Sequence, residues 1–291
     1  MTTPIDDPPG PTEAGEAADD LDLEIDLLLE AIVRKYSYEF RDYARASLRR
    51  RIRGALDAFG FASVSELQHH VLRDRQVFTT LLSRLTVTVS AMFRDPGYYL
   101  ALRREVLPML ATWPSLKIWV AGCSTGEEVY SLTILLDEAG LLERTHIYAT
   151  DINPEALRTA AAGVYPLARL AQFTRNYQQA GGTRSLADYY TAAYGNAAFD
   201  RRLRARVTFS DHSLATDQVF AEVQFVSCRN VLIYFNSRLQ DRAIGLFHDS
   251  LVMHGFLALG SHERVEGSTR ARGFRAVSRK DRIYQKVPYA D

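Results

Sequence analysis

A turn of small residues followed by two acidic residues is the part of this sequence best suited to hold a ligand. Residues 122–126 read Gly-Cys-Ser-Thr-Gly, and Glu127 and Glu128 follow directly. Small residues let a ligand approach the backbone, and the N-terminus of a following helix favours bound polar groups. The glycine spacing differs from Gly-x-Gly-x-x-Gly, and two carboxylates would repel a pyrophosphate. The turn therefore favours a cationic ligand without phosphate, unless the two acids only offset the helix dipole.

A third acid, Asp151, follows a short apolar run that ends at Thr150. At the end of a strand next to a glycine turn, a carboxylate can accept hydrogen bonds from both ribose hydroxyls of a nucleoside. S-adenosylmethionine combines a nucleoside with a sulfonium and an ammonium and has no phosphate. The sequence therefore favours S-adenosylmethionine over a dinucleotide, and it offers no ligand cluster for a metal.

The elements around the glycine turn and Asp151 predict a doubly wound α/β fold. Residues 116–121 and 146–150 are apolar runs typical of buried parallel strands, and residues 127–139 between them have a helical pattern. Asn153 and Pro154 begin the next helix as cap and first helical residue. Further strands are expected at 206–210, 223–228, 255–260, 274–277 and 282–287, and a helix at 236–251. Seven strands that end in a late hairpin predict a Rossmann-like sheet of the class I methyltransferase type.

The whole chain divides into four segments. Residues 1–20, rich in Pro, Gly, Ala and acids, are expected to be a disordered acidic tail. Residues 21–85 repeat apolar residues at helical spacing and predict a small all-helical domain, with Gly60 as a helix stop and Ser63 or Ser65 as a cap. Residues 86–97 are expected to be a linker that contributes to the cofactor site. Residues 98–291 form the methyltransferase domain, with an inserted β-subdomain at 164–204 around Gly181-Gly182.

Composition limits the class of protein. The 291 residues are 47% hydrophobic and 24% charged, with a formal net charge of 0, which argues against nucleic-acid binding. No apolar run is long enough to span a membrane, and no secretory signal is visible, so no membrane insertion is expected. Cys123 and Cys228 cannot form a disulfide framework, which favours a reducing, cytoplasmic location.

The zero net charge hides a strong asymmetry. Residues 1–30 hold ten acidic residues and no Lys or Arg, whereas residues 31–53 hold eight basic residues. Arginines recur there every fourth residue and gather along one helical stripe, and two more widen it: Arg41, Arg45, Arg49, Arg53, Arg50 and Arg51. Such a face is either solvated or the contact surface for an acidic partner.

Four segments resemble the CheR-type chemoreceptor glutamate methyltransferases. Residues 121–132 (AGCSTGEEVYSL) look like that family's glycine-turn signature, and residues 90–94 (SAMFR) are similar to its Thr-Ala-Phe-Phe-Arg stretch. Residues 149–153 (ATDIN) and 228–235 (CRNVLIYF) match two further motifs. The resemblance runs in order from about residue 25 to the C-terminus.

The resemblance implies a cofactor site for S-adenosylmethionine. Its residues would be Thr88, Ser90, Arg94, Ala121, Gly122, Glu127, Asp151, Ile152, Ser213, Leu214, Cys228 and Arg229. Arg94 would pair with the cofactor's carboxylate, Glu127 with its ammonium, and Asp151 with the ribose. Ser213 and Leu214 would meet the adenine. Tyr234 would face the methyl group, so Arg94 and Tyr234 are the expected catalytic residues.

The implied reaction is methyl transfer to glutamate side chains of chemoreceptors. A carboxylate is ionised at neutral pH and needs no general base, so orientation and a water-poor site should carry catalysis. The methylation helices of receptors would be the partner of the basic face, and the expected substrate-binding residues are Arg45, Arg49, Arg50 and Arg53. Some members grip a receptor C-terminal pentapeptide with a Gly-x-Gly loop. Gly181-Gly182 lacks that pattern, so no such tether is expected.

Two departures from the family pattern keep alternatives open. Ser213 stands where the family usually has Asn, and residues 260–263 read Gly-Ser-His-Glu where Gly-His-Ser-Glu is more common. One alternative is therefore a signalling module that binds S-adenosylmethionine without methylating receptors. Another is a class I methyltransferase for a different substrate, such as a small molecule or RNA, against which the neutral charge and the helical domain argue.

Overall fold

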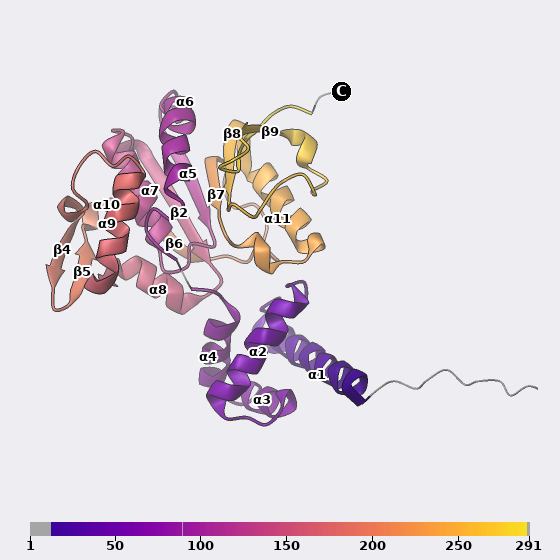
Figure 1. Cartoon of the computed structure of the whole chain (residues 1–291). Helices are drawn as coiled ribbons and strands as arrows, with labels where there is room; N and C mark the ends of the chain where they lie inside the picture. Colours follow the sequence, from indigo (N-terminus) through magenta and orange to yellow (C-terminus); the bar gives the residue numbers. More distant parts are fainter. Residues whose placement is uncertain (1–12, 89, 290–291) are drawn as a thin grey trace, which may run out of the picture. The chain divides into compact units, whose positions relative to one another are not determined.

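The computed structural model describes residues 13–88 and 90–289, and the chain divides into two compact units, residues 1–85 and 86–291. In the first unit the helices are α1 (Glu13–Tyr36), α2 (Arg45–Phe59), α3 (Val64–Val71) and α4 (Arg75–Leu85) (Figure 1). Their apolar faces meet in one core, in which Ile25, Ile52 and Leu81 are completely buried. Burial of these faces, rather than helix propensity alone, holds such short helices together.

Helix ends in this unit follow the expected local chemistry. Gly60 ends α2 with a φ of 72°, and its N–H donates to the carbonyl of Leu56. Ser63 caps α3 by accepting a hydrogen bond from the N–H of Glu66. Both predictions, the glycine stop and the serine cap, are confirmed.

Two expectations about this unit are wrong in part. The expected tail ends at residue 20, but α1 begins at Glu13, because residues 13–20 are rich in Ala and Glu, which favour a helix and complement its N-terminal dipole. Residues 1–12 of that tail lie outside the described residues. The stripe of arginines is also shorter than expected, since α2 begins at Arg45 and Arg41 lies in the preceding turn beside Glu39.

The second unit is built on a seven-stranded sheet with the order β6-β2-β1-β7-β8-β10-β9. The strands are β1 (Leu116–Ala121), β2 (Thr145–Asp151), β6 (Val207–Asp211), β7 (Val223–Cys228), β8 (Leu251–Leu259), β9 (Phe274–Ser278) and β10 (Ile283–Lys286). The first five strands in that order run parallel, and β10 is antiparallel to both β8 and β9. The predicted class I methyltransferase sheet with its late hairpin is confirmed, and the carboxyl ends of its parallel strands share one edge.

Helices pack against this sheet and supply most of its core. They are α5 (Pro96–Ala101), α6 (Leu107–Leu110), α7 (Glu127–Glu138), α8 (Pro154–Ala162) and α11 (Ser237–Ser250). Ile118 and Phe225 from the sheet and Leu132 from α7 are buried together. The helix expected over 98–110 contains a π-helical turn at Leu102–Val106, just before Pro108, which has no N–H to donate to the helical ladder.

Residues 164–204 carry a second, smaller sheet and share the core of this unit. They contain β3 (Val164–Pro166), α9 (Leu170–Gln179), β4 (Tyr190–Ala193), β5 (Asn196–Phe199) and α10 (Arg201–Arg204). The three strands make a sheet of order β3-β5-β4. Tyr165, Phe173 and Phe199 of this segment are buried in the core. In Figure 1 β4 and β5 lie on the opposite side of this unit from β8 and β9.

Candidate functional site

The glycine turn follows a course that only glycine allows at both of its ends. Gly122 has a φ of 72°, and a Cβ there would lie 2.5 Å from a methyl carbon of Val231. Gly126 has a φ of 91°, and its Cβ would lie 2.7 Å from that of Ala160. The N–H groups of Gly122 and Cys123 both donate to the carbonyl of Thr150 at 2.8 Å, which joins the turn to the end of β2. The turn is therefore tightly fixed at the carboxyl edge of the sheet.

Asp151 lies at that same edge, next to the turn. One of its carboxylate oxygens accepts the N–H of Ser124 at 2.8 Å, and the other accepts the N–H of Asn153 at 2.9 Å. Burial raises the pKa of this carboxyl above its ordinary value, and the backbone N–H groups oppose that shift. Ile152 beside it is half-buried. The position predicted to hold a ribose is thus fixed by backbone donors on both sides.

Glu127, at the first position of α7, is completely buried and already has two partners. Nη1 of Arg169 donates to Oε1 at 2.6 Å, and Oγ1 of Thr125 donates to Oε2 at 2.6 Å. Nη2 of Arg169 also donates to the carbonyl of Ser90. An ammonium group bound at Glu127 would therefore share the carboxylate with Arg169.

Arg169 is a site residue that sequence reasoning missed. It lies in the inserted segment, 42 positions from Glu127, in a stretch without a recognisable motif. A lone arginine in such a stretch is ordinarily a solvated surface residue, so nothing in the local pattern distinguishes it. Arg169 directly precedes α9, which packs against α5, and only this tertiary packing brings it to Glu127.

Arg229 lies buried just beyond the end of β7, at the centre of a polar network. Nη2 donates to Asp95 at 2.7 Å, Nη1 approaches Glu128 at 3.4 Å, and the guanidinium lies 4.0 Å from the ring centre of Tyr98. Burial acts to lower the pKa of Arg229, but Glu128 and the neighbouring phenols outweigh it and raise it, so the side chain stays charged. Its Nε is buried without a hydrogen-bond partner among the described residues.

Glu128 therefore does more than complement the helix dipole. Its Oε1 accepts the hydroxyl of Ser227 at 2.6 Å, and that hydroxyl lies 3.0 Å from the hydroxyl of Tyr98. The side chain thus links the start of α7 to the end of β7 through Arg229. Cys228, between Ser227 and Arg229, is completely buried, and burial raises the pKa of its thiol.

The segment that carries Arg94 has a strained backbone. Phe93 and Asp95 on either side of it have φ values of 50° and 58°, in the left-handed region that bulky residues rarely adopt. The N–H of Phe93 donates to Oγ of Ser131 at 2.8 Å. Arg94 itself is exposed, and no ion pair involves its guanidinium in the part of the chain that the structure describes. Its carbonyl accepts from Arg229 at 3.4 Å.

The remaining predicted residues are distributed around this edge. Thr88 is exposed and Ser90 half-buried, and Ala121 is buried at the end of β1. The N–H of Ser213 donates to Asp217 at 2.9 Å, and Leu214 is buried. The Ser213 hydroxyl accepts the N–H of Ala215 at 3.3 Å, within the same turn.

Glu263 is a second site residue that the sequence does not single out, although it lies in the Gly260–Glu263 stretch that departs from the family pattern. Its carboxylate is buried and accepts the N–H groups of Gly260, Asn230 and Ile233. Burial raises the pKa of Glu263, against the effect of these donors. The side chain therefore shapes the turn after β7 that leads to half-buried Tyr234.

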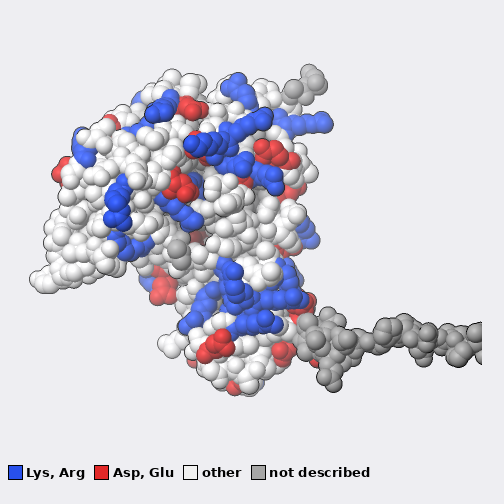
Figure 2. Space-filling model, in the orientation of Figure 1, with Lys and Arg blue, Asp and Glu red and all other residues white. Residues whose placement is uncertain are grey.

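The predicted substrate-binding arginines on α2 differ in their surroundings. Arg45 pairs with Asp26 at 2.6 Å and with Asp22 at 3.2 Å, and Arg49 donates to Asp22 at 2.6 Å. Arg50 and Arg53 are exposed and have no ion-pair partner within the described ranges. Figure 2 shows the basic side chains gathered over α2. Acids of α1 thus neutralise part of the stripe, and Arg50 and Arg53 remain available.

Across residues 13–88 and 90–289, no group of three His, Cys, Asp or Glu side chains is placed to hold a metal ion. Within those same ranges no helix combines the length and the apolar character needed to cross a membrane.

Comparison with known proteins gives matches over nearly the whole chain. Residues 88–280 match the model of the CheR methyltransferase SAM-binding domain, and residues 23–86 match that of the CheR methyltransferase all-alpha domain. A protein of Pseudomonas putida that carries the name Cher3 is 59% identical over 265 residues, which cover 91% of this chain and 97% of that protein. A chemotaxis protein methyltransferase of Listeria innocua is 28% identical over 84% of this chain and 92% of its own length. Chemotaxis protein methyltransferase 1 of Pseudomonas aeruginosa is 28% identical over 74% of this chain and 80% of its own length.

Proposed function

This chain belongs to the CheR methyltransferase family, and from that premise we propose that it methylates glutamate side chains of chemoreceptors. It is an S-adenosylmethionine-dependent methyltransferase, and the receptor glutamate is the proposed part. One observation carries the proposal. The family-like segments 90–94, 121–132, 149–153 and 228–235 come together at one edge of the sheet and are joined there by hydrogen bonds.

The side chains at this edge suit the cofactor. The site offers two carboxylates, Glu127 and Asp151, to a ligand that carries positive charge and ribose hydroxyls and has no phosphate. Two buried polar atoms, Oγ of Ser124 and Nε of Arg229, have no hydrogen-bond partner among the described residues and can serve a ligand. We assign the ammonium to Glu127, the ribose to Asp151 and the cofactor's carboxylate to Arg94.

The other residues complete the proposed cofactor site. They are Thr88, Ser90, Ala121, Gly122, Ile152, Ser213, Leu214, Cys228 and Arg229. Because the Ser213 hydroxyl is engaged with Ala215 in its own turn, we propose that backbone groups rather than that side chain hold the adenine.

When bound, S-adenosylmethionine supplies an electrophilic methyl group on a sulfonium. The substrate carboxylate is ionised at neutral pH, so a C–O bond can form as the C–S bond breaks, and no residue has to take a proton. The task of this chain is to orient the two groups and exclude water. Arg94 and Tyr234 are the residues proposed to do so, and the strained backbone around Arg94 supports that role.

The test is transfer of labelled methyl from S-adenosylmethionine to membranes that contain the organism's chemoreceptors. A base-labile methyl ester on receptor glutamates is expected. At saturating cofactor, Tyr234→Phe and Arg94→Ala should each lower turnover by about tenfold or more. Cofactor binding without methyl transfer to any receptor would instead indicate a signalling module, and unchanged turnover in both variants would remove the two residues from the mechanism.

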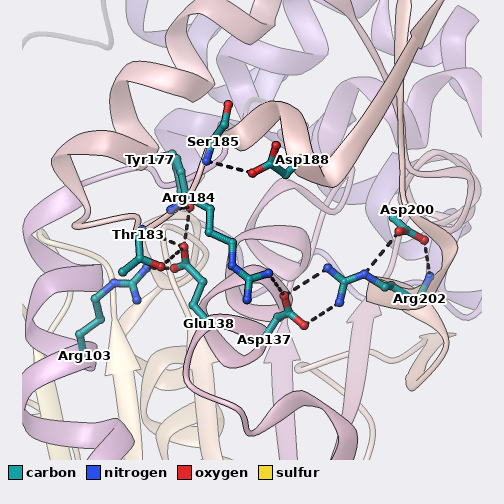
Figure 3. Close-up of polar contacts among 10 residues, drawn as sticks. All are labelled: Arg103, Asp137, Glu138, Tyr177, Thr183, Arg184, Ser185, Asp188, Asp200 and Arg202. Carbon is teal, nitrogen blue, oxygen red and sulfur yellow. Dashed lines mark hydrogen bonds and ion pairs between the residues drawn. The ribbon is translucent and has the colours of Figure 1, made fainter.

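The loop at Gly181-Gly182 supports an enzyme without a peptide tether. Figure 3 shows Glu138 of α7 next to Tyr177 and Thr183, and its carboxylate accepts from the Tyr177 hydroxyl at 2.5 Å and from the N–H and hydroxyl of Thr183 at 2.9 Å. Arg103 also donates to Glu138, and a Cβ on Gly182 would lie 2.3 Å from the Tyr177 ring. The loop is thus fixed by side chains of its own unit. We propose that it binds no receptor C-terminal pentapeptide, and measurable binding of such a peptide would contradict this.

A further inference from the structure

The turn between β9 and β10 carries an excess of positive charge. It reads Arg279-Lys280-Asp281-Arg282, and its one acid is used within the turn, because Oδ2 of Asp281 accepts the hydroxyl of Ser278 at 2.7 Å. Arg279 and Lys280 are exposed, and neither has an ion-pair partner in the described part of the chain. We refer to Arg279, Lys280 and Arg282 as the basic turn.

The basic turn lies at the same edge of the sheet as the proposed cofactor site. The carbonyl of Arg282 accepts the N–H of Leu259 at 3.0 Å. Nε of Arg282 donates to the carbonyl of Ser261 at 3.2 Å. On its other side, Oδ1 of Asp281 lies 3.5 Å from the position of a Cβ on Gly97. The turn is therefore placed between the loop that follows β8 and the first residues of α5.

Both of these neighbours lead directly to the proposed reaction site. Gly97 follows Arg94 and Asp95, and Asp95 pairs with Arg229 at 2.7 Å. The loop after β8 continues to Glu263, which holds the turn that precedes Tyr234. The basic turn is thus part of the rim of the site, on the unit that carries the site itself.

The backbone of the basic turn is fixed at Arg282. Arg282 has a φ of 56°, in the left-handed region that residues with a Cβ rarely adopt, and it is half-buried. The neighbouring acid, Glu263, is buried and satisfied by backbone N–H groups, so it offers no charge to solvent. Exposed Arg264 adds a further cation to the loop after β8. In Figure 2 basic side chains form much of the surface over β8 and β9.

We infer that the basic turn, with Arg264, is a docking contact for the acidic helical segment of the protein substrate that carries the glutamates to be methylated. This inference rests on the proposed function. Positive charge beside the site attracts a segment rich in carboxylates and suppresses binding of neutral ones. Each methyl transfer removes one negative charge from that segment. The contact therefore holds the unmethylated substrate more tightly than the product and favours product release.

The decisive experiment compares two charge-reversed variants of the full-length protein. The double variant R279E/K280E changes the basic turn, and the matched control R201E/R272E makes the same change in net charge at exposed positions away from it. Arg201 begins α10, on the other side of the unit in Figure 1, and Arg272 lies at the opposite end of β9 from the turn. KM for a receptor cytoplasmic fragment, turnover, and the Kd of S-adenosylmethionine are measured at low and high salt.

R279E/K280E should raise KM for the receptor fragment by about fivefold or more at low salt, and the effect should shrink at high salt. The Kd of S-adenosylmethionine should stay within about twofold of the wild-type value, which also shows that the unit is folded. An unchanged KM, or an equal rise in R201E/R272E, overturns the docking contact while leaving the proposed function in place. If the wild-type protein binds S-adenosylmethionine but methylates no receptor, the proposed function fails and the docking contact falls with it.

Discussion

The contact between Arg169 and Glu127 allows the most direct test of the site. We consider Arg169→Met, which keeps an unbranched apolar stem and removes the guanidinium. The variant leaves one oxygen of a completely buried carboxylate without its partner and frees the carbonyl of Ser90. It also removes the guanidinium that lies 4.8 Å from the ring centre of Phe173.

The size of the effect follows from exposure. Breaking a fully buried ion pair costs about 3–5 kcal/mol, but the Arg169 side chain is 35% exposed, so water can partly replace it. A hydrogen bond to a charged group is worth about 1.5–3 kcal/mol, and the ring contact adds about 0.5 kcal/mol. The free energy of unfolding should therefore fall by about 2–3 kcal/mol. For a unit of this size the melting temperature should drop by roughly 5–10 °C.

The assay is denaturant unfolding followed by tryptophan fluorescence. Both tryptophans, Trp113 and Trp119, lie in the second unit, residues 86–291, so the fluorescence signal reports the unfolding of that unit alone. Isothermal titration calorimetry then gives the Kd of S-adenosylmethionine, which should rise by about tenfold because Glu127 and Ser90 are no longer held together. Arg175→Met, at an exposed position of α9, the helix that begins directly after Arg169, is the matched control and should behave like the wild type.

Two results would refute this reasoning. If Arg169→Met and Arg175→Met unfold at the same denaturant concentration, the buried contact adds no stability. If Arg169→Met binds S-adenosylmethionine more tightly than the wild type, Arg169 competes with the cofactor for Glu127 instead of placing the carboxylate.

Three further predictions concern the glycine turn at Gly126, the contact of Glu138 on α7 with the inserted segment, and the basic face of α2. Gly126→Ala should lower the free energy of unfolding by about 2 kcal/mol and weaken cofactor binding. The reason is that residue 126 has a φ of 91° and that a Cβ there would lie 2.7 Å from the Cβ of Ala160. Calorimetry and unfolding curves that match the wild type would contradict this prediction. Burial acts to raise the pKa of Glu138, but its hydrogen bonds outweigh burial and hold it below the ordinary value of 4.5. This carboxylate therefore stabilises the fold above pH 4.5 and loses that effect as the pH falls through its folded pKa. Glu138→Gln should flatten the pH dependence of the free energy of unfolding in that acid range. An unchanged pH profile would refute the role of Glu138. Arg53→Glu should raise KM for the receptor at low salt by about threefold, and Arg75→Glu, an exposed control on α4, should not; equal effects would remove the steering role of α2.

Much of the framework could be predicted from short-range patterns. Strand and helix periodicity, the Gly60 stop and the Ser63 cap depend on a few neighbouring residues, so they survive in any tertiary context that buries the apolar faces. The glycine turn and the acid after β2 could also be predicted, because a parallel sheet places the ends of its strands together.

The partners of the charged residues could not be predicted in the same way. Arg169 reaches Glu127 across 42 positions, and Arg229 reaches Glu128 across 101. No local pattern encodes such pairs, because they form only when separate elements pack and water leaves the space between them. The same is true of the α2 arginines in the first unit, where Arg49 forms an ion pair with Asp22 of α1 that no local pattern predicts.

The sequence by itself thus determined which elements form, where the cofactor turn lies and which acids stand beside it, since these depend on neighbouring residues and on strand direction. The tertiary structure decided which charges are neutralised and which remain exposed. Arg49 is paired, Arg53 is exposed, and the basic turn lies at the rim of the site. The physical reason is that a charge acts on a partner through distance and burial, and both are set only when the elements pack.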